Sequence, residues 1–269
     1  MAKIIIQEKI KKFNKTIRVD GDKSLSIRSL LIGSQSYGLC KIKNLSKSGD
    51  ILSTINGLKK LGIKIIFKKE ICYLYGKGLN GFNYKKNILI NAGNSGTFAR
   101  LLLGLLIKTP HEIKLVGDKS LSKRDFQRIM DPLKEFGANF KSQKKKNLPL
   151  KILGTEFLKP INYFEKKGSA QCKSSVILAA LNTPGKTLVK AKKSRNHTEL
   201  LLKYLNIPIK IKTKKNYDMI EINGENQFKS FNYEIPGDIS SCAFFIVLTL
   251  LSKDSKLTIK DVNVNPSRI

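Results

Sequence analysis

The sequence predicts an α/β protein made of repeated βαβαββ units, with helices packed on mixed sheets. Three observations support this fold class. Gly/Ser turns that lead into apolar helical segments recur at intervals of 72, 75 and 69 residues. A helix-ending octet recurs in step with these turns, and strand-like segments recur between and after the two signals. Self-similarity at a fixed period is typical of a repeat architecture.

The first helix of each unit begins at a Gly/Ser turn. The four turns with their apolar runs are GDKSLSIRSLLIG from Gly21, GNSGTFARLLLGLL from Gly93, GSAQCKSSVILAAL from Gly168 and GDISSCAFFIVLTLL from Gly237. Small polar residues before an apolar run are typical of a helix N-terminus, where side-chain oxygens cap backbone N–H groups. We therefore expect a helix after each turn, with free N–H groups that a ligand can approach.

The second helix of each unit ends in an octet with a shared pattern. The octets are LKKLGIKI at 58–65, LKEFGANF at 133–140 and LKYLNIPI at 202–209. Their fifth residues, Gly62, Gly137 and Asn206, tolerate the left-handed conformation that often follows a helix. The segment 50–61 has apolar residues at helical spacing, so we expect amphipathic helices on one face of each sheet.

Strand-like segments complete each unit. The predicted strands cover 39–45, 112–116 and 186–191 after the first helix; 72–75, 150–153 and 218–223 after the octet; and 88–91, 161–164 and 232–235 before the next turn. A fourth unit is cut short, because a turn helix at 237–251 and a strand at 256–262 are followed only by NVNPSRI. We expect a fragment, or a chain that another chain completes; a natural short end is the alternative.

The composition favours small anionic ligands over nucleic acid. The chain has 269 residues, of which 41% are hydrophobic, enough for one large core or two ordinary domains. The formal net charge is +31, but only seven of the 51 basic residues are arginines. The lysines are scattered and lack interleaved aromatic residues, which predicts a solvated surface rather than a nucleic-acid interface. The charge would still attract a small anionic substrate.

The cysteines and the apolar runs indicate a cytoplasmic protein. The four cysteines stand at 40, 72, 172 and 242, without the spacing of a metal site or a redox pair. We expect buried free thiols in a reducing compartment, and no bound metal. The N-terminal MAKIIIQEKIKKF lacks the apolar core of a signal peptide, and the run 242–251 is too short to span a bilayer.

The opening turn has the residues of an anion site. It places Lys23 and Ser24 at a helix N-terminus, and Arg28 follows one turn later on the same face as Ser24. Arginine suits bidentate contacts with phosphate or carboxylate, whereas lysine acts as a point charge. The turn therefore predicts a site for an anionic group.

The other turns repeat these residue types. Candidate helix caps or ligand hydroxyls stand at each turn: Ser24, Thr97, Ser169 and Ser240. Further arginines stand near expected helix starts at Arg100, Arg124, Arg128 and Arg195. Arg124 and Arg128 follow a second copy of GDKSLS as an i,i+4 pair. Several cationic turns on one scaffold predict substrates with more than one anionic group.

Each of these features has a structural alternative. The turns GNSGT and SAQ are common, and an arginine such as Arg128 could pair with a carboxylate such as Asp131. His197 suits a packing position at a helix start better than a catalytic one, and Asp50 and Asp238 suit caps or structural partners. Their combination in one repeated pattern favours a binding site.

Six long stretches carry a family resemblance. They are GDKSLSIR at 21–28, NAGNSGTFARLLLG at 91–104, GDKSLSKRDFQRIMDPLKEFGA at 117–138, GSAQCKSSVILAAL at 168–181, SRNHTELLL at 194–202 and PGDISSCAFFIV at 236–247. With them the chain resembles the 5-enolpyruvylshikimate-3-phosphate synthases, or 3-phosphoshikimate 1-carboxyvinyltransferases. The resemblance implies an enolpyruvyl transferase-like two-domain architecture: 21–235 would be a complete domain of three repeats, and 1–20 with 236–269 an incomplete second domain.

The resemblance also implies an activity and its residues. The family transfers the enolpyruvyl (1-carboxyvinyl) group of phosphoenolpyruvate to the 5-hydroxyl of shikimate 3-phosphate, releases phosphate and needs no cofactor. The residues implied to bind shikimate 3-phosphate are Lys23, Ser24, Arg28, Ser169, Gln171 and Arg195. Those implied to bind phosphoenolpyruvate are Lys23, Asn94, Gly96, Arg124 and Gln171, and Lys23 is implied to be catalytic. Ala170 stands where some relatives have serine, and Asn196 replaces a common aspartate.

Two alternatives to this activity remain open. The resemblance places the proton-transferring carboxylates in the second domain, beyond residue 269, so we expect this chain alone to be inactive. A sister transferase that uses UDP-N-acetylglucosamine is one alternative, although GDKSLS and SAQCKSS favour shikimate 3-phosphate. A non-catalytic anion- or nucleic-acid-binding remnant is the other. We expect a monomeric protein, when complete, of the shikimate pathway of aromatic amino-acid biosynthesis, with small anionic partners and no membrane partner.

Overall fold

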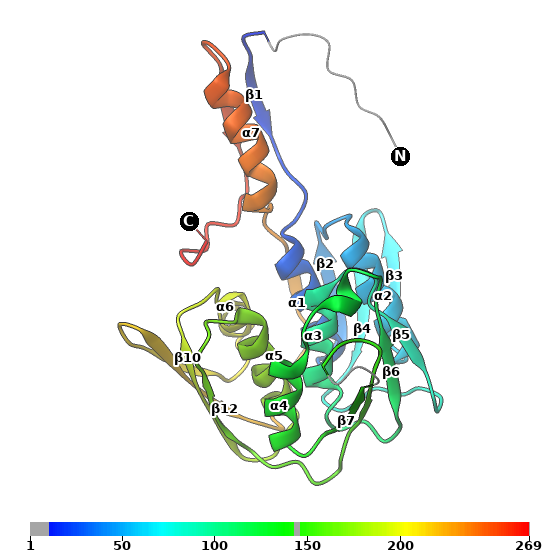
Figure 1. The fold of residues 1–269 in the computed structure, drawn as a ribbon. Helices are drawn as coiled ribbons and strands as arrows, with labels where there is room; N and C mark the ends of the chain where they lie inside the picture. The colour runs from blue at the N-terminus through cyan, green and yellow to red at the C-terminus, as the bar shows by residue number, and fades with distance from the viewer. Residues whose placement is uncertain (1–10, 143–145, 269) are drawn as a thin grey trace.

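The computed structural model describes residues 11–142 and 146–268, and Figure 1 shows their arrangement. Three sheets with their helices form one body, from which helix α7 (Ile239–Leu251) and strands β1 (Asn14–Ile17) and β14 (Lys256–Ile259) project. Of the predicted partial second domain, residues 1–10 and Ile269 lie outside the described part.

The three sheets of the body share one topology. The first has the order β13 (Asn232–Glu234), β2 (Tyr37–Lys43), β4 (Ile71–Lys77), β3 (Lys64–Lys68). The second has the order β5 (Leu89–Asn91), β6 (Ile113–Val116), β8 (Leu150–Leu153), β7 (Asn139–Ser142). The third has the order β9 (Asn162–Glu165), β10 (Lys186–Lys192), β12 (Tyr217–Asn223), β11 (Lys210–Thr213). In each sheet the first pair is parallel and the others are antiparallel, which confirms the predicted class of mixed-sheet repeats.

The three repeats close into a ring. The second and third sheets each take their outer parallel strand, β5 or β9, from the chain just before their own first helix. The first sheet takes β13 instead, with Asn232 opposite Lys41, so that the end of the third repeat completes the first. Strand β1, which precedes the first turn, pairs in parallel with β14, with Asn14 opposite Lys256. Segments that are distant in the sequence thus complete the first sheet and form the two-stranded sheet of the projecting part.

The predicted ends of the second helices are confirmed. These helices are α2 (Gly49–Lys60), α4 (Gln127–Glu135) and α6 (His197–Tyr204). The octet residues Gly62, Gly137 and Asn206 have φ angles of 84°, 114° and 56°, the left-handed conformation expected after a helix. The chain can therefore reverse there and enter β3, β7 or β11.

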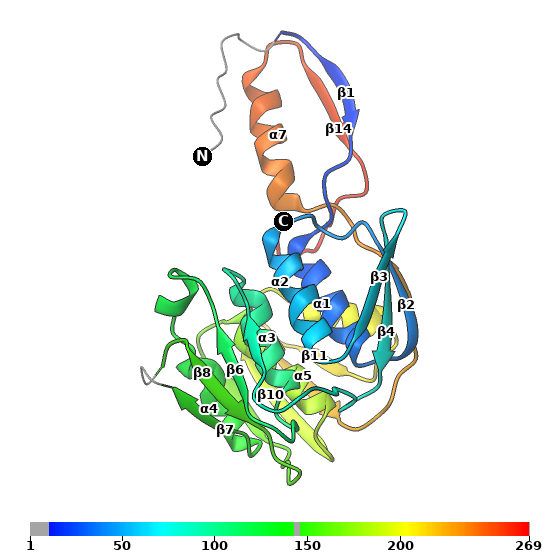
Figure 2. The same cartoon turned by 90° about the vertical axis from the view of Figure 1, so that its right-hand side faces the viewer.

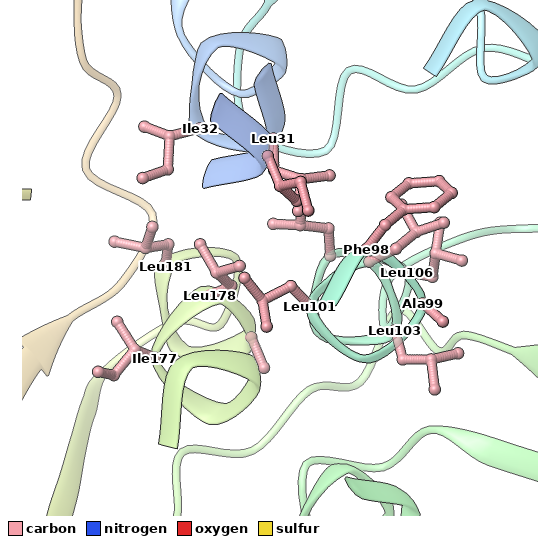
Figure 3. Close-up of a cluster of buried hydrophobic side chains, with 14 of the residues drawn as sticks. Leu31, Ile32, Phe98, Ala99, Leu101, Leu103, Leu106, Ile177, Leu178 and Leu181 are labelled. Carbon is pink, nitrogen blue, oxygen red and sulfur yellow. The ribbon is translucent and has the colours of Figure 1, made fainter. Parts of the chain in front are cut away.

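The first helices of the three repeats pack together at the centre of the body. They are α1 (Lys23–Ser34), α3 (Gly96–Leu105) and α5 (Ala170–Leu181). Every residue of 25–34 and 172–181 is buried, so α1 and α5 are enclosed on all sides, which agrees with the apolar helices expected after the Gly/Ser turns. Figure 3 shows their contact, with Leu31 of α1, Leu101 of α3 and Leu178 of α5 in one cluster.

Helix α7 is apolar but mostly exposed. Phe244, Leu250 and Leu251 are 80%, 80% and 82% exposed, and Cys242 is its buried residue. Figure 2 shows the helix beside β1 and β14, away from the three sheets. Among the described residues, no helix is long and apolar enough to cross a membrane.

Two chain segments join this projecting part to the body, and they run side by side. The Asp22 N–H donates to the Pro236 carbonyl oxygen (2.8 Å), and the Asp238 N–H donates to the Asp20 carbonyl oxygen (2.9 Å). A Cβ on Gly21 would lie 1.8 Å from a backbone oxygen in the loop after β2, so only glycine fits this crossing.

Replacing Gly104 by alanine is expected to lower the free energy of unfolding by about 1–3 kcal/mol, because its Cβ would lie 2.2 Å from the Ser175 carbonyl oxygen on α5. Gly49→Ala is the matched control within α2, since its Cβ would have no atom within 4 Å. The control should stabilise by about 0.5–1 kcal/mol. Urea denaturation measures both, and equal effects would contradict the close approach of α3 and α5.

Candidate anion-binding site

The N-termini of the three central helices meet at one pocket. Its volume is about 430 Å³, and its lining comes from the starts of α1, α3 and α5 and from the segment that leads into α6. The lining residues are Ser24, Arg28, Thr97, Gly168, Ser169, Ala170, Gln171, Ser194, Arg195 and His197. Backbone N–H groups and the positive ends of three helix dipoles favour an anion in such a place.

Three of the candidate cap hydroxyls, Ser24, Thr97 and Ser240, are not caps. Asp238 caps α7, since its Oδ1 accepts the Ser240 N–H (2.8 Å). Asp22 caps α1 and Ser95 caps α3, each through a side-chain oxygen that accepts an N–H of the first turn (2.9 and 3.3 Å). Ser169 caps α5 in the same way (3.3 Å), as one of the two predicted roles requires. Ser24 and Thr97 line the pocket instead. Because aspartate and serine already satisfy the helix ends, these two hydroxyls can face a ligand.

Arg28 is the buried cation of the pocket. It is 4% exposed, and its Nε donates to Thr198 Oγ1 (2.7 Å). Its Nη groups donate to the Ser24 carbonyl oxygen (3.0 Å) and to Ser174 Oγ (3.3 Å). Burial lowers the pKa of Arg28 to about 10, and the Glu199 carboxylate acts in the opposite direction. Arg28 is therefore charged at neutral pH and fixed in place.

Gln171 is held between two helices. Its Oε1 accepts from Arg100 Nη1 (2.5 Å), and its Nε2 donates to Thr97 Oγ1 (3.0 Å). Ser175 Oγ on α5 donates to the Arg100 carbonyl oxygen (2.9 Å). Arg100 is not paired with a carboxylate side chain, as the structural alternative would require, but with this amide and the Asp125 carbonyl oxygen (3.3 Å). The contacts join α3 to α5 at the pocket.

Arg124 lies beside the start of α3. Its Nη2 donates to Asn94 Oδ1 (2.9 Å), and Asn94 Nδ2 donates to Asp118 Oδ2 (2.7 Å). A Cβ on Gly96 would lie 2.8 Å from Arg124 Nη1, so the glycine leaves the space that this guanidinium uses. Arg124 has an extended backbone and precedes α4, which begins at Gln127, so it does not share a helix face with Arg128.

Lys23 lies outside the pocket lining. Its side chain is 48% exposed, and its Nζ is 3.4 Å from Asp50 Oδ2. Its backbone N–H donates to Asp238 Oδ2 (3.2 Å). Asp50 and Asp238 therefore have the roles of structural partners that the sequence suggested, and both hold Lys23 near the crossing of the two segments.

The structure brings together most of one predicted residue set and little of the other. Ser24, Arg28, Ser169, Gln171 and Arg195 line the pocket, which is the predicted shikimate 3-phosphate set without Lys23. Of the predicted phosphoenolpyruvate set, the pocket lining contains only Gln171. Asn94, Gly96 and Arg124 lie together at the start of α3, outside that lining.

Glu165 supports the pocket and was not found from the sequence. It is 3% exposed at the end of β9, and its two carboxylate oxygens accept the N–H groups of Lys167 (3.1 Å) and Ser169 (2.9 Å). These bonds fix the loop that contains Gly168, whose φ is 71°. The only sequence signal was an acidic residue between a strand and a glycine turn, which is too common a pattern to identify its role.

His197 is a packing residue of the pocket wall. It begins α6, is 2% exposed, and its Nε2 has no hydrogen-bond partner among the described residues. Burial, together with Arg28, Arg268 and Arg195, lowers its pKa to about 3. It is therefore neutral at physiological pH, in agreement with the packing interpretation.

Other candidate chemistry is weaker. The four cysteines are free and buried, and burial raises the pKa of Cys72 to about 12. Within the described residues, no group of three or more His, Cys, Asp or Glu side chains could hold a metal ion. A larger cavity of about 1110 Å³ lies by the crossing of the two segments, and none of the predicted site residues lines it.

The fold and the pocket define a class: ring-closed βαβαββ repeats whose central helices present their N-termini at one anion-suited pocket. Residues 7–269 match the family profile described as EPSP synthase (3-phosphoshikimate 1-carboxyvinyltransferase). The chain therefore belongs to the EPSP synthase family.

Curated relatives and solved structures agree with this family. A 3-phosphoshikimate 1-carboxyvinyltransferase of Streptococcus agalactiae serotype III (strain NEM316) is 42% identical over 255 residues, which are 94% of this chain and 58% of the relative. One of Vesicomyosocius okutanii is 40% identical over 269 residues, all of this chain and 60% of the relative. The EPSP synthase structure from Acinetobacter baumannii has a TM-score of 0.86 at 33% identity, and the match covers 95% of this chain and 57% of that chain.

His197 gives a testable pH dependence of stability. Its pKa is lowered on folding, so the unfolded chain binds its proton first, and stability should fall as the pH falls from about 6.5 towards 3. At pH 5 this contribution is about 2 kcal/mol relative to pH 8. Between pH 8 and pH 5 the free energy of unfolding of His197→Gln, measured by urea denaturation, should fall less than that of the unchanged chain. Identical losses would show that His197 protonates freely in the folded protein.

Proposed function

We propose that this chain binds shikimate 3-phosphate and phosphoenolpyruvate for the transfer of the enolpyruvyl group to the 5-hydroxyl of shikimate 3-phosphate, with release of phosphate. The observation that carries the proposal is the single pocket in which three helix N-termini meet Arg28 and Arg195. Family membership supplies the reaction, and the pocket supplies a suitable place for its anionic substrates. The pathway would be aromatic amino-acid biosynthesis in the cytoplasm.

The pocket suits a rigid, polyhydroxylated phosphate. Arg28 is fixed by three hydrogen bonds, and Arg195 is an exposed cation on the opposite segment of the lining. Ser24 and Ser169 add hydroxyls at two helix ends. Guanidinium groups match the geometry of phosphate and carboxylate oxygens, and the hydroxyls can bond to ring hydroxyls of the ligand.

Phosphoenolpyruvate would lie at the start of α3. The Arg124 guanidinium is held by Asn94 and has space because residue 96 is glycine. Arg100 links this place to the pocket, since its Nη1 contacts Gln171 and would be 3.5 Å from a Cβ at Gly96. Two adjacent cationic binding sites, one for each substrate, would supply the proximity that a group transfer requires.

The pocket supports binding more than proton transfer. Among the described residues of its lining there is no carboxylate, and its one histidine is buried with a lowered pKa. We assign the role of proton-handling group to Lys23, which stands between Asp50 and Asp238. The chain spans 58% of its Streptococcus relative, and we propose that by itself it binds substrates with little or no turnover.

The domain assignment follows the same proposal. Residues 21–235 include all strands of the three ring-closed sheets, which supports one domain of three repeats. Residues of 11–20 and 236–268 include β1, α7 and β14, which pair with one another outside the ring. We propose that these segments belong to a second domain.

Isothermal calorimetry with shikimate 3-phosphate tests the proposal. The chain should bind it, with weaker or no binding of UDP-N-acetylglucosamine. Arg195→Met should weaken binding about 10- to 100-fold, because a charge-assisted contact is lost, while stability is unchanged since Arg195 is exposed.

The matched control is Arg18→Met. Arg18 pairs with Asp261 at the surface, away from the pocket lining, so the affinity should not change. Preference for the UDP-sugar, or salt-sensitive binding of random oligonucleotides that Arg195→Met leaves intact, would overturn the proposal.

Gly96→Ala tests the phosphoenolpyruvate place separately. The added Cβ would lie 2.8 Å from Arg124 Nη1 and should push the guanidinium away from Asn94. With shikimate 3-phosphate present, the affinity for phosphoenolpyruvate should fall about 10-fold or more, because one bidentate contact is displaced. The affinity for shikimate 3-phosphate alone should stay the same. A fall in both affinities would contradict separate substrate places.

A further inference from the structure

A fully buried ion pair lies behind the pocket. Lys173 on α5 and Glu199 on α6 are 0% and 3% exposed, and Lys173 Nζ is 2.6 Å from Glu199 Oε1. Removing two charges from water costs much of what their attraction returns, so a buried pair is weak evidence for a purely stabilising role. Apolar residues of similar volume often replace such a pair without loss of stability.

The pair adjoins the residues that hold Arg28. Ser174 follows Lys173 in α5, and Thr198 precedes Glu199 in α6. Both hydroxyls accept hydrogen bonds from the Arg28 guanidinium, and Thr198 Oγ1 also donates to Ser174 Oγ (2.7 Å). The ion pair and this hydroxyl pair therefore form two adjacent links between the same two helices.

The charges around Arg28 give Glu199 a second role. Three charged groups act on the buried guanidinium: Glu199 and Asp22 favour its charged form, and Arg195 opposes it. Asp22 contributes less than Glu199, and each carboxylate has a cation of its own, Arg268 for Asp22 (3.2 Å) and Lys173 for Glu199 (2.6 Å). Glu199 is thus a buried carboxylate that favours the charged form of Arg28 from α6, the helix whose Thr198 binds that guanidinium.

We propose that Lys173 and Glu199 are positioning residues for the anion site. The Lys173–Glu199 pair ties α5 to α6, so that Ser174 and Thr198 on these two helices hold the buried Arg28 guanidinium in one orientation. This tie also fixes the distance across the pocket, because Gln171 lies in the first turn of α5 and Arg195 precedes α6. The identity of the ligand rests on the proposed function, whereas the effect on Arg28 does not.

Two variants and one matched control test the proposal. Glu199→Gln removes the counter-charge without changing the shape, and Lys173→Met/Glu199→Leu replaces the whole pair by apolar groups that a buried site tolerates. The control is Lys108→Met/Glu225→Gln, which removes an ion pair of 3.0 Å between two other segments, outside the pocket lining.

The first measurement needs no ligand. NMR reports the hydrogen exchange of the Arg28 Nε–H, which is protected in the free chain by its bond to Thr198 Oγ1 (2.7 Å). Both variants should raise this exchange rate by about 10-fold or more, because a displaced guanidinium loses that bond. The control should leave it unchanged. Glu199→Asp, which keeps the charge, should restore part of the protection.

The second measurement is calorimetry with shikimate 3-phosphate from pH 7 to pH 10. Both variants should bind about 10-fold more weakly at pH 7. In Glu199→Gln the loss of affinity with rising pH should begin at a lower pH than in the unchanged chain, because Arg28 is easier to deprotonate. If the role of Glu199 were purely structural, the pH at which the affinity begins to fall would be the same in the variant and the unchanged chain.

The two measurements separate the two proposals. If the unchanged chain binds no shikimate 3-phosphate but the exchange of Arg28 responds as stated, the proposed function fails and the positioning role stands. If binding is present and neither exchange nor affinity responds, the positioning role is overturned. Circular dichroism shows whether each variant is folded. The exchange and affinity of one folded variant are enough to test the positioning role. Unfolding of both variants would also overturn the proposal, because the pair would then be a requirement of the fold as a whole.

Discussion

The close packing of three central helices is the constraint on which the rest of the structure depends. Helices α1, α3 and α5 approach so closely that Gly104 has no space for a Cβ beside the Ser175 carbonyl oxygen. The three helices occupy equivalent positions in a ring of repeats, and their N-termini lie together at one pocket. The positive ends of three helix dipoles therefore meet at one pocket. In this fold the anion site is a consequence of the packing of the core, whose apolar cluster Figure 3 shows.

Concentrated positive charge has a cost that the surrounding residues offset. Arg28 is buried, and its lowered pKa reflects the loss of water. Hydroxyl acceptors on two helices orient it, and the buried Glu199 supplies opposite charge, with Lys173 as its own partner. A preorganised cation needs little rearrangement when an anion arrives, which is the property that a binding site for charged substrates requires.

The crossing of the two linking segments connects the pocket to the projecting part. Asp22 caps α1, the helix whose second residue is Ser24, and the same carboxylate accepts from Asn263 and Arg268. Asp238 caps α7 and also accepts the Lys23 N–H. The helix starts on both sides of the crossing thus share their capping groups, and Lys23 is hydrogen-bonded to the cap of α7.

Much of the fold followed from the sequence, because its signals are local. Hydrophobic period, turn glycines and the left-handed positions at Gly62, Gly137 and Asn206 specify a helix or a strand from a few neighbouring residues. The family and the pocket residues Ser24, Arg28, Ser169, Gln171 and Arg195 came from long motifs.

Other features depended on distant partners, and only the tertiary structure decided them. The strand pattern alone could not show that β13 rather than β1 completes the first sheet, and only the family resemblance grouped 1–20 with 236–269. The sequence also could not show that Asp22 and Ser95 cap their helices, that Glu165 fixes the pocket loop, or that Lys173 meets Glu199. The local sequence determined the repeat and its residue types, and long-range packing determined which of them meet.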